Sequence, residues 1–297
     1  QMIDEVVVIG YGTQRRGSVT GAVAGVKGKD MIQTKNENPQ NMLTGRVAGL
    51  RVWQKSSEPG TFNNSFDVRG MGTPLVVIDG IPRSVEEFQR LNAQDIEDIS
   101  VLKDASAAIY GVRAANGVVL VTTKKGAAGK TEFSYNGSYT FQHPSRMPEL
   151  CNPFESMTLF NEMSMNNING GSWVFGEDAF EAYRNGTRRT TDWNDLIISN
   201  VAPQTQHDIS ISGGTEKTKF YISMGYFYQE GIFRSGDLNY NKFNLRSNIS
   251  TEITKGIKFE LGVSAVSDER NTPFSSAQDI IRNYWRQGVL YPAFADL

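Results

Sequence analysis

The chain has 297 residues, enough for two domains with a sizeable core. Its 30 Lys and Arg residues nearly balance its 32 Asp and Glu residues, so no basic surface indicates nucleic-acid binding. One cysteine and two distant histidines exclude a disulfide framework and argue against a metal site, and we expect no cofactor. No apolar run is long enough for a transmembrane helix, but a transmembrane barrel hides its lipid face in alternate residues.

The first half of the chain, to about Gly129, has the pattern of a mixed α/β domain. Short apolar runs bounded by glycine predict buried strands at 6–9, 75–78 and 118–121. Between them, the pattern predicts short helices at 39–47 and 104–110. Asn38 is the expected N-cap of the first helix, with Pro39 at its first position.

From Thr131 onward the pattern changes to long strands in which apolar and polar residues alternate. In residues 131–142 the aromatic side chains share one face and the polar side chains share the other, and three later segments repeat this. We count five long strands. Their length exceeds the usual strand of five or six residues and suits a tilted membrane crossing. A soluble antiparallel sandwich also alternates, but strand length and loop asymmetry favour the barrel.

The alternation predicts which side chains face lipid and which face the lumen or the plug, because a charge facing hydrocarbon is costly. Those expected to face lipid are Phe133, Phe141, Phe243, Leu245, Phe259 and Leu261. Those expected to face inward are Glu132, Arg246 and Glu260.

The connections between these strands are alternately short and long. Residues 213–216 and 254–256 have the composition of tight turns, whereas 144–204 and 231–239 are longer. Outer-membrane barrels have short periplasmic turns and long outer loops, so the loop 144–204 is expected outside the cell. It contains helical spacing at 153–166 and 176–183.

At this point the residues resemble a known family, the SusC/RagA-type TonB-dependent transporters of Bacteroidetes. Six segments of the sequence resemble segments of the family and follow one another in the same order: Asp4–Thr13, Leu43–Leu50, Val68–Gly72, Leu75–Gly80, Asp95–Gly111 and Arg113–Gly126. The similarity extends into the expected barrel through Ser212–Thr218 and Gly225–Gly231.

The resemblance implies an α+β plug domain followed by antiparallel strands of a transmembrane β-barrel. We assign residues 1–129 to the TonB box and plug, and residues 130–297 to the first part of the barrel with its long outer loops. A closed barrel of this class needs about 22 strands, so we expect the chain to be the N-terminal portion of a longer polypeptide. The family often has a small β-sandwich domain before the plug, and the sequence pattern predicts none within these 297 residues.

The opening strand resembles a TonB box, the segment that an energy-transducing partner grips by strand addition. Its residues are Asp4, Glu5, Val6, Val7, Val8 and Ile9. The alternative is an ordinary plug strand.

Polar and turn residues of the plug motifs are candidates for contacts with the barrel wall. They are Arg69, Gly70, Asp79, Gly80, Glu97, Asp98, Lys103, Asp104 and Arg113. Hydrated, charged contacts would keep a plug seated and still let force dislodge it. The alternative is that these residues only cap helices and solubilise the plug.

The resemblance implies active import of oligosaccharides or peptides across the bacterial outer membrane, powered through TonB, ExbB and ExbD, with no enzymatic activity. A SusD-like surface lipoprotein is the expected lid, and aromatic residues of the outer loop are candidates for docking it: Trp173, Phe175, Tyr183 and Trp193. These aromatics can equally serve internal packing. Two rival functions stay open, a soluble or surface-attached β-rich binding protein and a transporter that acts mainly as a signalling transducer.

Overall fold

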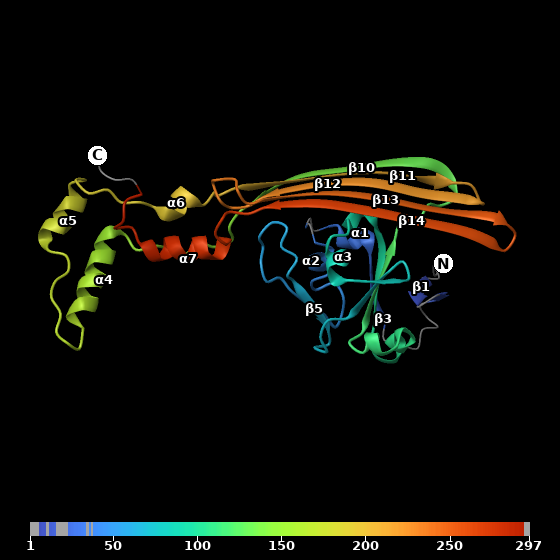
Figure 1. The fold of residues 1–297 in the computed structure, drawn as a ribbon, viewed down its shortest axis with the longest axis horizontal. Coiled ribbons are helices and arrows are strands. Elements are labelled where there is room, and N and C mark those ends of the chain that lie inside the picture. Colours follow the sequence, from blue (N-terminus) through green and yellow to red (C-terminus); the bar gives the residue numbers. More distant parts are fainter. Residues whose placement is uncertain (1–5, 10–11, 16–22, 34–35, 37, 294–297) are drawn as a thin grey trace. The chain divides into compact units, whose positions relative to one another are not determined.

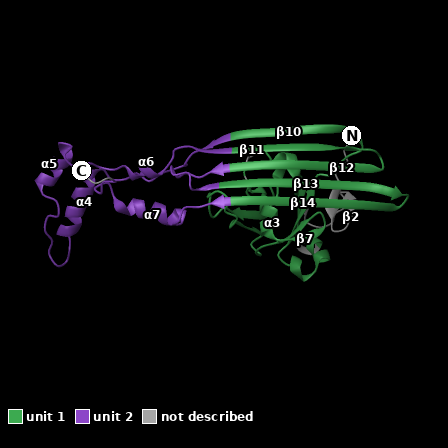
Figure 2. Cartoon of the chain, turned by 45° about the horizontal axis from the view of Figure 1, so that its top comes forward, with its two compact units in different colours: residues 1–139, 205–228, 240–269 green, residues 140–204, 229–239, 270–297 purple. Residues whose placement is uncertain are grey.

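The computed structural model describes residues 6–9, 12–15, 23–33, 36 and 38–293 (Figure 1). The chain divides into two compact units, coloured separately in Figure 2. Unit 1 holds residues 1–139, 205–228 and 240–269, and unit 2 holds residues 140–204, 229–239 and 270–297.

The centre of unit 1 is a five-stranded mixed sheet with the strand order β3-β8-β9-β6-β7. Its strands are β3 (Val23–Lys27), β6 (Leu75–Ile78), β7 (Ile81–Arg83), β8 (Ile96–Leu102) and β9 (Val118–Thr123). Strands β6 and β9 run parallel, and the other neighbours are antiparallel. The strands predicted at 75–78 and 118–121 are therefore confirmed.

Both faces of this sheet are covered, which explains why its strands have continuous apolar runs. In β9, Val119 and Val121 belong to one buried cluster, whereas Val118 and Leu120 belong to a second cluster. Successive side chains of a strand point to opposite faces, so each cluster packs on one face of the sheet.

Short helices and turns cover this sheet. They are α1 (Gly28–Met31), α2 (Pro39–Met42), α3 (Val85–Gln89) and the 3₁₀ segments η2 (Ala93–Asp95), η3 (Asp104–Tyr110) and η4 (Val112–Ala114). Asn38 caps α2 as predicted, since its side chain accepts a hydrogen bond of 2.9 Å from the Gln40 N–H. The predicted helix 39–47 is too long. Gly45 and Gly49 both have positive φ, which ends the helical path.

Two small hairpins complete the plug part of unit 1. Strand β1 (Val6–Ile9) pairs antiparallel with β2 (Gly12–Arg15), so the strand predicted at 6–9 is confirmed at the level of its backbone. Strand β4 (Leu50–Trp53) pairs with β5 (Ser65–Val68).

A second sheet of five long antiparallel strands follows in the order β10-β11-β12-β13-β14. The strands are β10 (Gly129–Gln142), β11 (Ala202–Gly214), β12 (Thr218–Glu230), β13 (Asn239–Thr254) and β14 (Ile257–Asn271). The predicted tight turns lie between β11 and β12 and between β13 and β14. The predicted count of five long strands is confirmed. Four of them show the alternation of apolar and polar residues, whereas β11 carries polar residues such as Gln204, Gln206 and Asp208 and has no clear apolar face in the sequence.

The plug packs against one face of this long sheet within unit 1 (Figure 1). The opposite face is apolar and exposed, and it includes all six side chains predicted to face lipid. Arg246 points to the plug and Glu260 forms an ion pair with Lys125, as predicted. No described contact tests Glu132, whose inward direction stays a prediction.

Unit 2 contains the helices α4 (Pro153–Met165), α5 (Glu177–Arg184), α6 (Trp193–Ile197) and α7 (Ala277–Gln287). The helical spacing found at 153–166 and 176–183 is confirmed. Ile198, Phe233, Leu238 and Tyr284 form its buried cluster. None of the helices in the described ranges has the length and apolar character needed to cross a membrane.

Candidate functional site: the contact between plug and wall

Asp79 occupies the tight turn between β6 and β7, and its carboxylate lies against Thr123 at the end of β9. Ile78 of β6 pairs with Ile81 of β7, so Asp79 and Gly80 form the two-residue loop of a hairpin. Both have positive φ, 49° and 84°, the geometry that Asp-Gly hairpins adopt. The Asp79 carboxylate accepts hydrogen bonds from Thr123, 2.8 Å from the backbone N and 2.6 Å from Oγ1.

Asp95 is the second plug carboxylate at this contact, and it is almost fully buried. It ends the 3₁₀ segment η2, which Asn92 caps by accepting a hydrogen bond from the Gln94 N–H. Two hydroxyl groups of β12 donate to Asp95 Oδ1, Tyr221 at 2.9 Å and Ser223 at 2.6 Å. The plug carboxylate is thus held by side chains of the long sheet.

Arg246 of β13 lies between the two carboxylates. Its Nη1 is 3.7 Å from Asp79 Oδ2, and its Nε is 3.6 Å from Asp95 Oδ2. The side chain is only 11% exposed, so the guanidinium depends on these carboxylates for compensation of its charge. We call the set Asp79, Asp95, Thr123, Tyr221, Ser223 and Arg246 the Arg246 network.

Neighbouring amide side chains add further links between the plug and the long sheet. Asn92 donates to Asp208 of β11 at 2.6 Å. Asn248 of β13 donates to Thr123 Oγ1 at 3.0 Å and to the Lys124 carbonyl at 2.7 Å. The contact is therefore polar on both sides, unlike the interior of the plug.

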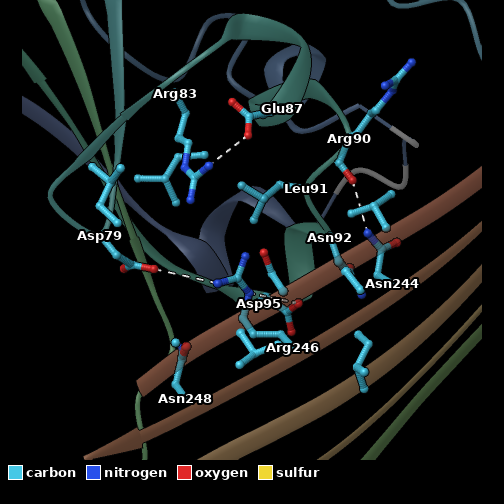
Figure 3. A pocket seen from close by; sticks show the side chains of 18 residues that line it. Asp79, Arg83, Glu87, Arg90, Leu91, Asn92, Asp95, Asn244, Arg246 and Asn248 are labelled. Atoms are coloured by element: carbon cyan, nitrogen blue, oxygen red, sulfur yellow. Dashed lines mark hydrogen bonds and ion pairs between the residues drawn. The ribbon is translucent and has the colours of Figure 1, made fainter. Parts of the chain in front are cut away.

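A cavity of about 390 Å³ adjoins the Arg246 network (Figure 3). Figure 3 shows that plug residues such as Arg83, Glu87 and Arg90 lie on one side of it. Residues of β13 and β14 line the other side. The described residues contain no group of three His, Cys, Asp or Glu side chains suited to a metal ion. The arrangement holds two surfaces together through hydrogen bonds and ion pairs.

The structure places the other predicted plug residues in different settings. Arg69 and Gly70 form a turn after β5, in which the Gly70 N–H donates to Asp67 at 2.7 Å. The Lys103 ammonium donates to the Ala48 carbonyl inside the plug. Ser100 donates to Asp98, while Glu97 and Arg113 are exposed. The side chain of Asp104 lies outside the described part. Of the predicted plug contacts, Asp79 is therefore the one that the described ion pairs place against the wall.

Several members of this contact were not singled out from the sequence. Asp95 opens the family segment that ends at Gly111, but its residue type and position do not distinguish it from its neighbours Glu97 and Asp98. Tyr221 and Ser223 lie on the face of β12 opposite Ile222 and Met224, so the period-two pattern could have identified them as inward-facing.

The predicted TonB box lies partly outside the described residues. Nothing is described for Asp4 and Glu5, whereas the backbone of 6–9 forms β1 and pairs with β2.

The four aromatic residues of the predicted docking loop differ in their contacts within unit 2. Trp193 donates from Nε1 to the Gly288 carbonyl at 3.0 Å, and Tyr183 donates to the Leu290 carbonyl at 3.2 Å. Phe175 packs edge-on against Phe160. Trp173, by contrast, is 70% exposed.

Comparison with known proteins identifies the family. Residues 15–118 match the TonB-dependent receptor plug domain. TonB-dependent receptor P26 of Formosa agariphila is 36% identical over 281 residues, which are 91% of this chain and 27% of that protein. TonB-dependent receptor SusC of Bacteroides thetaiotaomicron is 34% identical over 264 residues, covering 84% of this chain and 25% of the relative. The chain therefore spans about a quarter of the length of these curated relatives.

Solved structures agree with these matches. The RagAB peptide importer in its open-open state superposes with a TM-score of 0.76 at 29% identity, over 90% of this chain and 32% of that chain. The siderophore receptor PirA of Acinetobacter baumannii shares the fold at a TM-score of 0.51 and 17% identity. The chain thus belongs to the SusC/RagA-type TonB-dependent receptors of the bacterial outer membrane, and it comprises a plug domain followed by the first strands of a transmembrane barrel.

Proposed function

We propose that this chain is the gate and the first part of the wall of an importer that takes up oligosaccharides or peptides across the outer membrane. The Arg246 network carries the proposal, because it joins the plug to the long sheet through contacts that a pulling force can break. On this view the importer uses energy from TonB, ExbB and ExbD and does no covalent chemistry on its substrate. The domain boundary at 129/130 then separates the moving gate from the fixed wall.

Strand β1 is the point at which TonB would grip the gate. It forms a short apolar strand whose described pairing is with β2, and strand addition needs a free edge. In the full-length protein, Val7→Pro removes one backbone donor and we expect it to abolish uptake. The Val7→Ile variant keeps the donor and the β-branched shape, so it serves as the matched control.

The test measures uptake of a panel of labelled oligosaccharides and oligopeptides by intact cells. Barrel assembly is measured by heat-modifiable migration on gels, and we expect it to be unchanged in both variants. Normal uptake by the Val7→Pro variant would remove the TonB-box assignment. The same panel decides between glycans and peptides, since the RagAB relative is a peptide importer and the name of the SusC relative specifies no substrate.

The loop 144–204 is proposed to lie outside the cell and to dock a SusD-like lipoprotein through its exposed aromatic surface. Trp173 supports this role best, because Trp193 and Tyr183 already donate to carbonyl groups of unit 2. Trp173→Ala should reduce co-purification of the lipoprotein without changing folding. Maleimide labelling at Asn185→Cys, with Cys151 replaced by Ser, tests exposure on intact cells.

A further inference from the structure

The plug meets the long sheet through two contrasting regions. On the side of β10, β11 and β12 the contact is tight. The cavity lined by residues of these three strands measures about 30 Å³, and a cavity that reaches from β11 and β12 to β13 measures about 10 Å³. Asn92 and Asp208 approach to 2.6 Å, and so do Ser223 and Asp95. Such spaces hold at most about one water molecule.

On the side of β13 and β14 the contact is loose. The cavity of about 390 Å³ lies here, which is room for about a dozen water molecules. The ion pairs around it are long, 3.7 Å between Arg246 and Asp79 and 3.4 Å between Arg90 and Asp268. The buried Nε of Arg246 makes no direct hydrogen bond to the described residues. The two bonds from Asn248 are the short contacts on this side.

The lining of the cavity is polar and balanced in charge. Three arginines and three carboxylates line it, namely Arg83, Arg90, Arg246, Asp79, Glu87 and Asp95. Three asparagines, at 92, 244 and 248, add amide donors and acceptors. Such a surface hydrogen-bonds polar solutes without selecting for net charge.

We propose that the substrate passage opens between the plug and strands β13 and β14, while the plug stays attached to β10, β11 and β12. The proposal rests on the importer function above and assigns the route to one side of the plug. The class of solute that this route takes is polar and either neutral or zwitterionic, which includes sugars and peptides.

The physical reason is the different cost of separating the two surfaces. Where the cavity leaves room for water between polar groups, each group can exchange a protein partner for water as the plug moves. Asp95 borders the large cavity but is almost fully buried, and separation from β12 would remove its direct hydrogen bonds from Tyr221 and Ser223 before water can replace them.

Two matched cross-links in the full-length protein test the route. The first joins cysteines placed at Gln94 and Ser134, which line the small cavity beside β10. The second joins cysteines placed at Arg90 of the plug and Asp268 of β14, whose side chains form an ion pair. Both use a short, reducible dithiol linker and replace the exposed Cys151 by Ser, with single-cysteine variants as controls.

The readout is KCl current through the purified protein in a planar lipid bilayer, with urea added to loosen the plug. We expect current with the Gln94–Ser134 link and loss of current with the Arg90–Asp268 link, restored when the linker is reduced. Equal block by both links, or block by the first link alone, overturns the proposal, and so does current through both. Absence of current in the unlinked protein instead overturns the gated-pore function.

Discussion

The plug sheet and the long sheet are both built from five strands, yet they are stabilised in opposite ways. The plug sheet is covered on both faces by buried apolar clusters. The long sheet exposes its apolar residues on one face and presents polar residues to the plug on the other. The plug therefore has the interior of a soluble domain, whereas the long sheet depends on lipid outside and on hydrogen bonds inside.

In the proposed importer, this difference would separate the folding of the plug from its movement as a gate. A plug held to its wall by an apolar interface would be as hard to move as to unfold. A polar interface allows the plug core to stay intact while the contacts at the wall break. The following variants of the full-length protein test that separation, from the largest expected effect to the smallest.

Removing a core aromatic should damage the plug and spare the barrel. Phe88 is fully buried in the plug core, and Phe88→Ala should lower plug stability by about 3–5 kcal/mol. Hydrogen exchange of the β8 and β9 amides measures this loss. The control is Val112→Ala, at a highly exposed plug position, which should change exchange little. If Phe88→Ala speeds exchange in β12 of the long sheet as much as in β9 of the plug sheet, the two sheets unfold together and the prediction is wrong.

Removing the guanidinium should release the plug without unfolding it. Arg246→Met leaves Asp95 buried without its cation, and loss of one partner of a buried pair costs about 3–5 kcal/mol at the site. We expect a larger KCl leak through the full-length protein and unchanged exchange at β9.

Tyr221→Phe is the graded control for Arg246→Met, since it removes one hydrogen bond from the same carboxylate and should have a smaller effect, about 1.5–3 kcal/mol. If the Arg246→Met variant leaks no more KCl than the unaltered protein, the Arg246 network does not hold the gate closed.

A charge on the outer face of the long sheet should impair insertion. Leu245 is exposed beside the inward Arg246, and Leu245→Arg should cost about 2–4 kcal/mol if it lies near the bilayer centre. Ser264→Arg places the same charge on the inner face, where the cavity has room for it. The amount of folded protein in the outer membrane is measured for both. Equal yields of the two variants would contradict the assignment of the faces.

Removing an exposed ion pair should have the smallest effect. Lys125 and Glu260 are 3.5 Å apart and both more than half exposed, so Lys125→Gln should change stability by less than about 1 kcal/mol. The leak should match that of the unaltered protein. A leak as large as that of Arg246→Met would mean that burial does not decide which contacts hold the plug.

The sequence by itself determined the family, the two patterns of strands and several local features. Periodicity depends only on neighbouring residues, so the alternation correctly placed Arg246 inside and Leu245 outside. Local turn chemistry likewise placed the Asn38 cap. The predicted length of the helix after Asn38 was wrong, because helix propensity does not indicate that the chain must turn at Gly45.

Only the tertiary structure decided which polar residues meet. Asp95, Tyr221 and Arg246 are far apart along the chain, and no local pattern states that one guanidinium lies between Asp95 and Asp79. The same holds for the loose and tight sides of the plug, which are properties of the space between two surfaces. Packing across that space depends on the three-dimensional placement of each strand, and a sequence read residue by residue does not contain it.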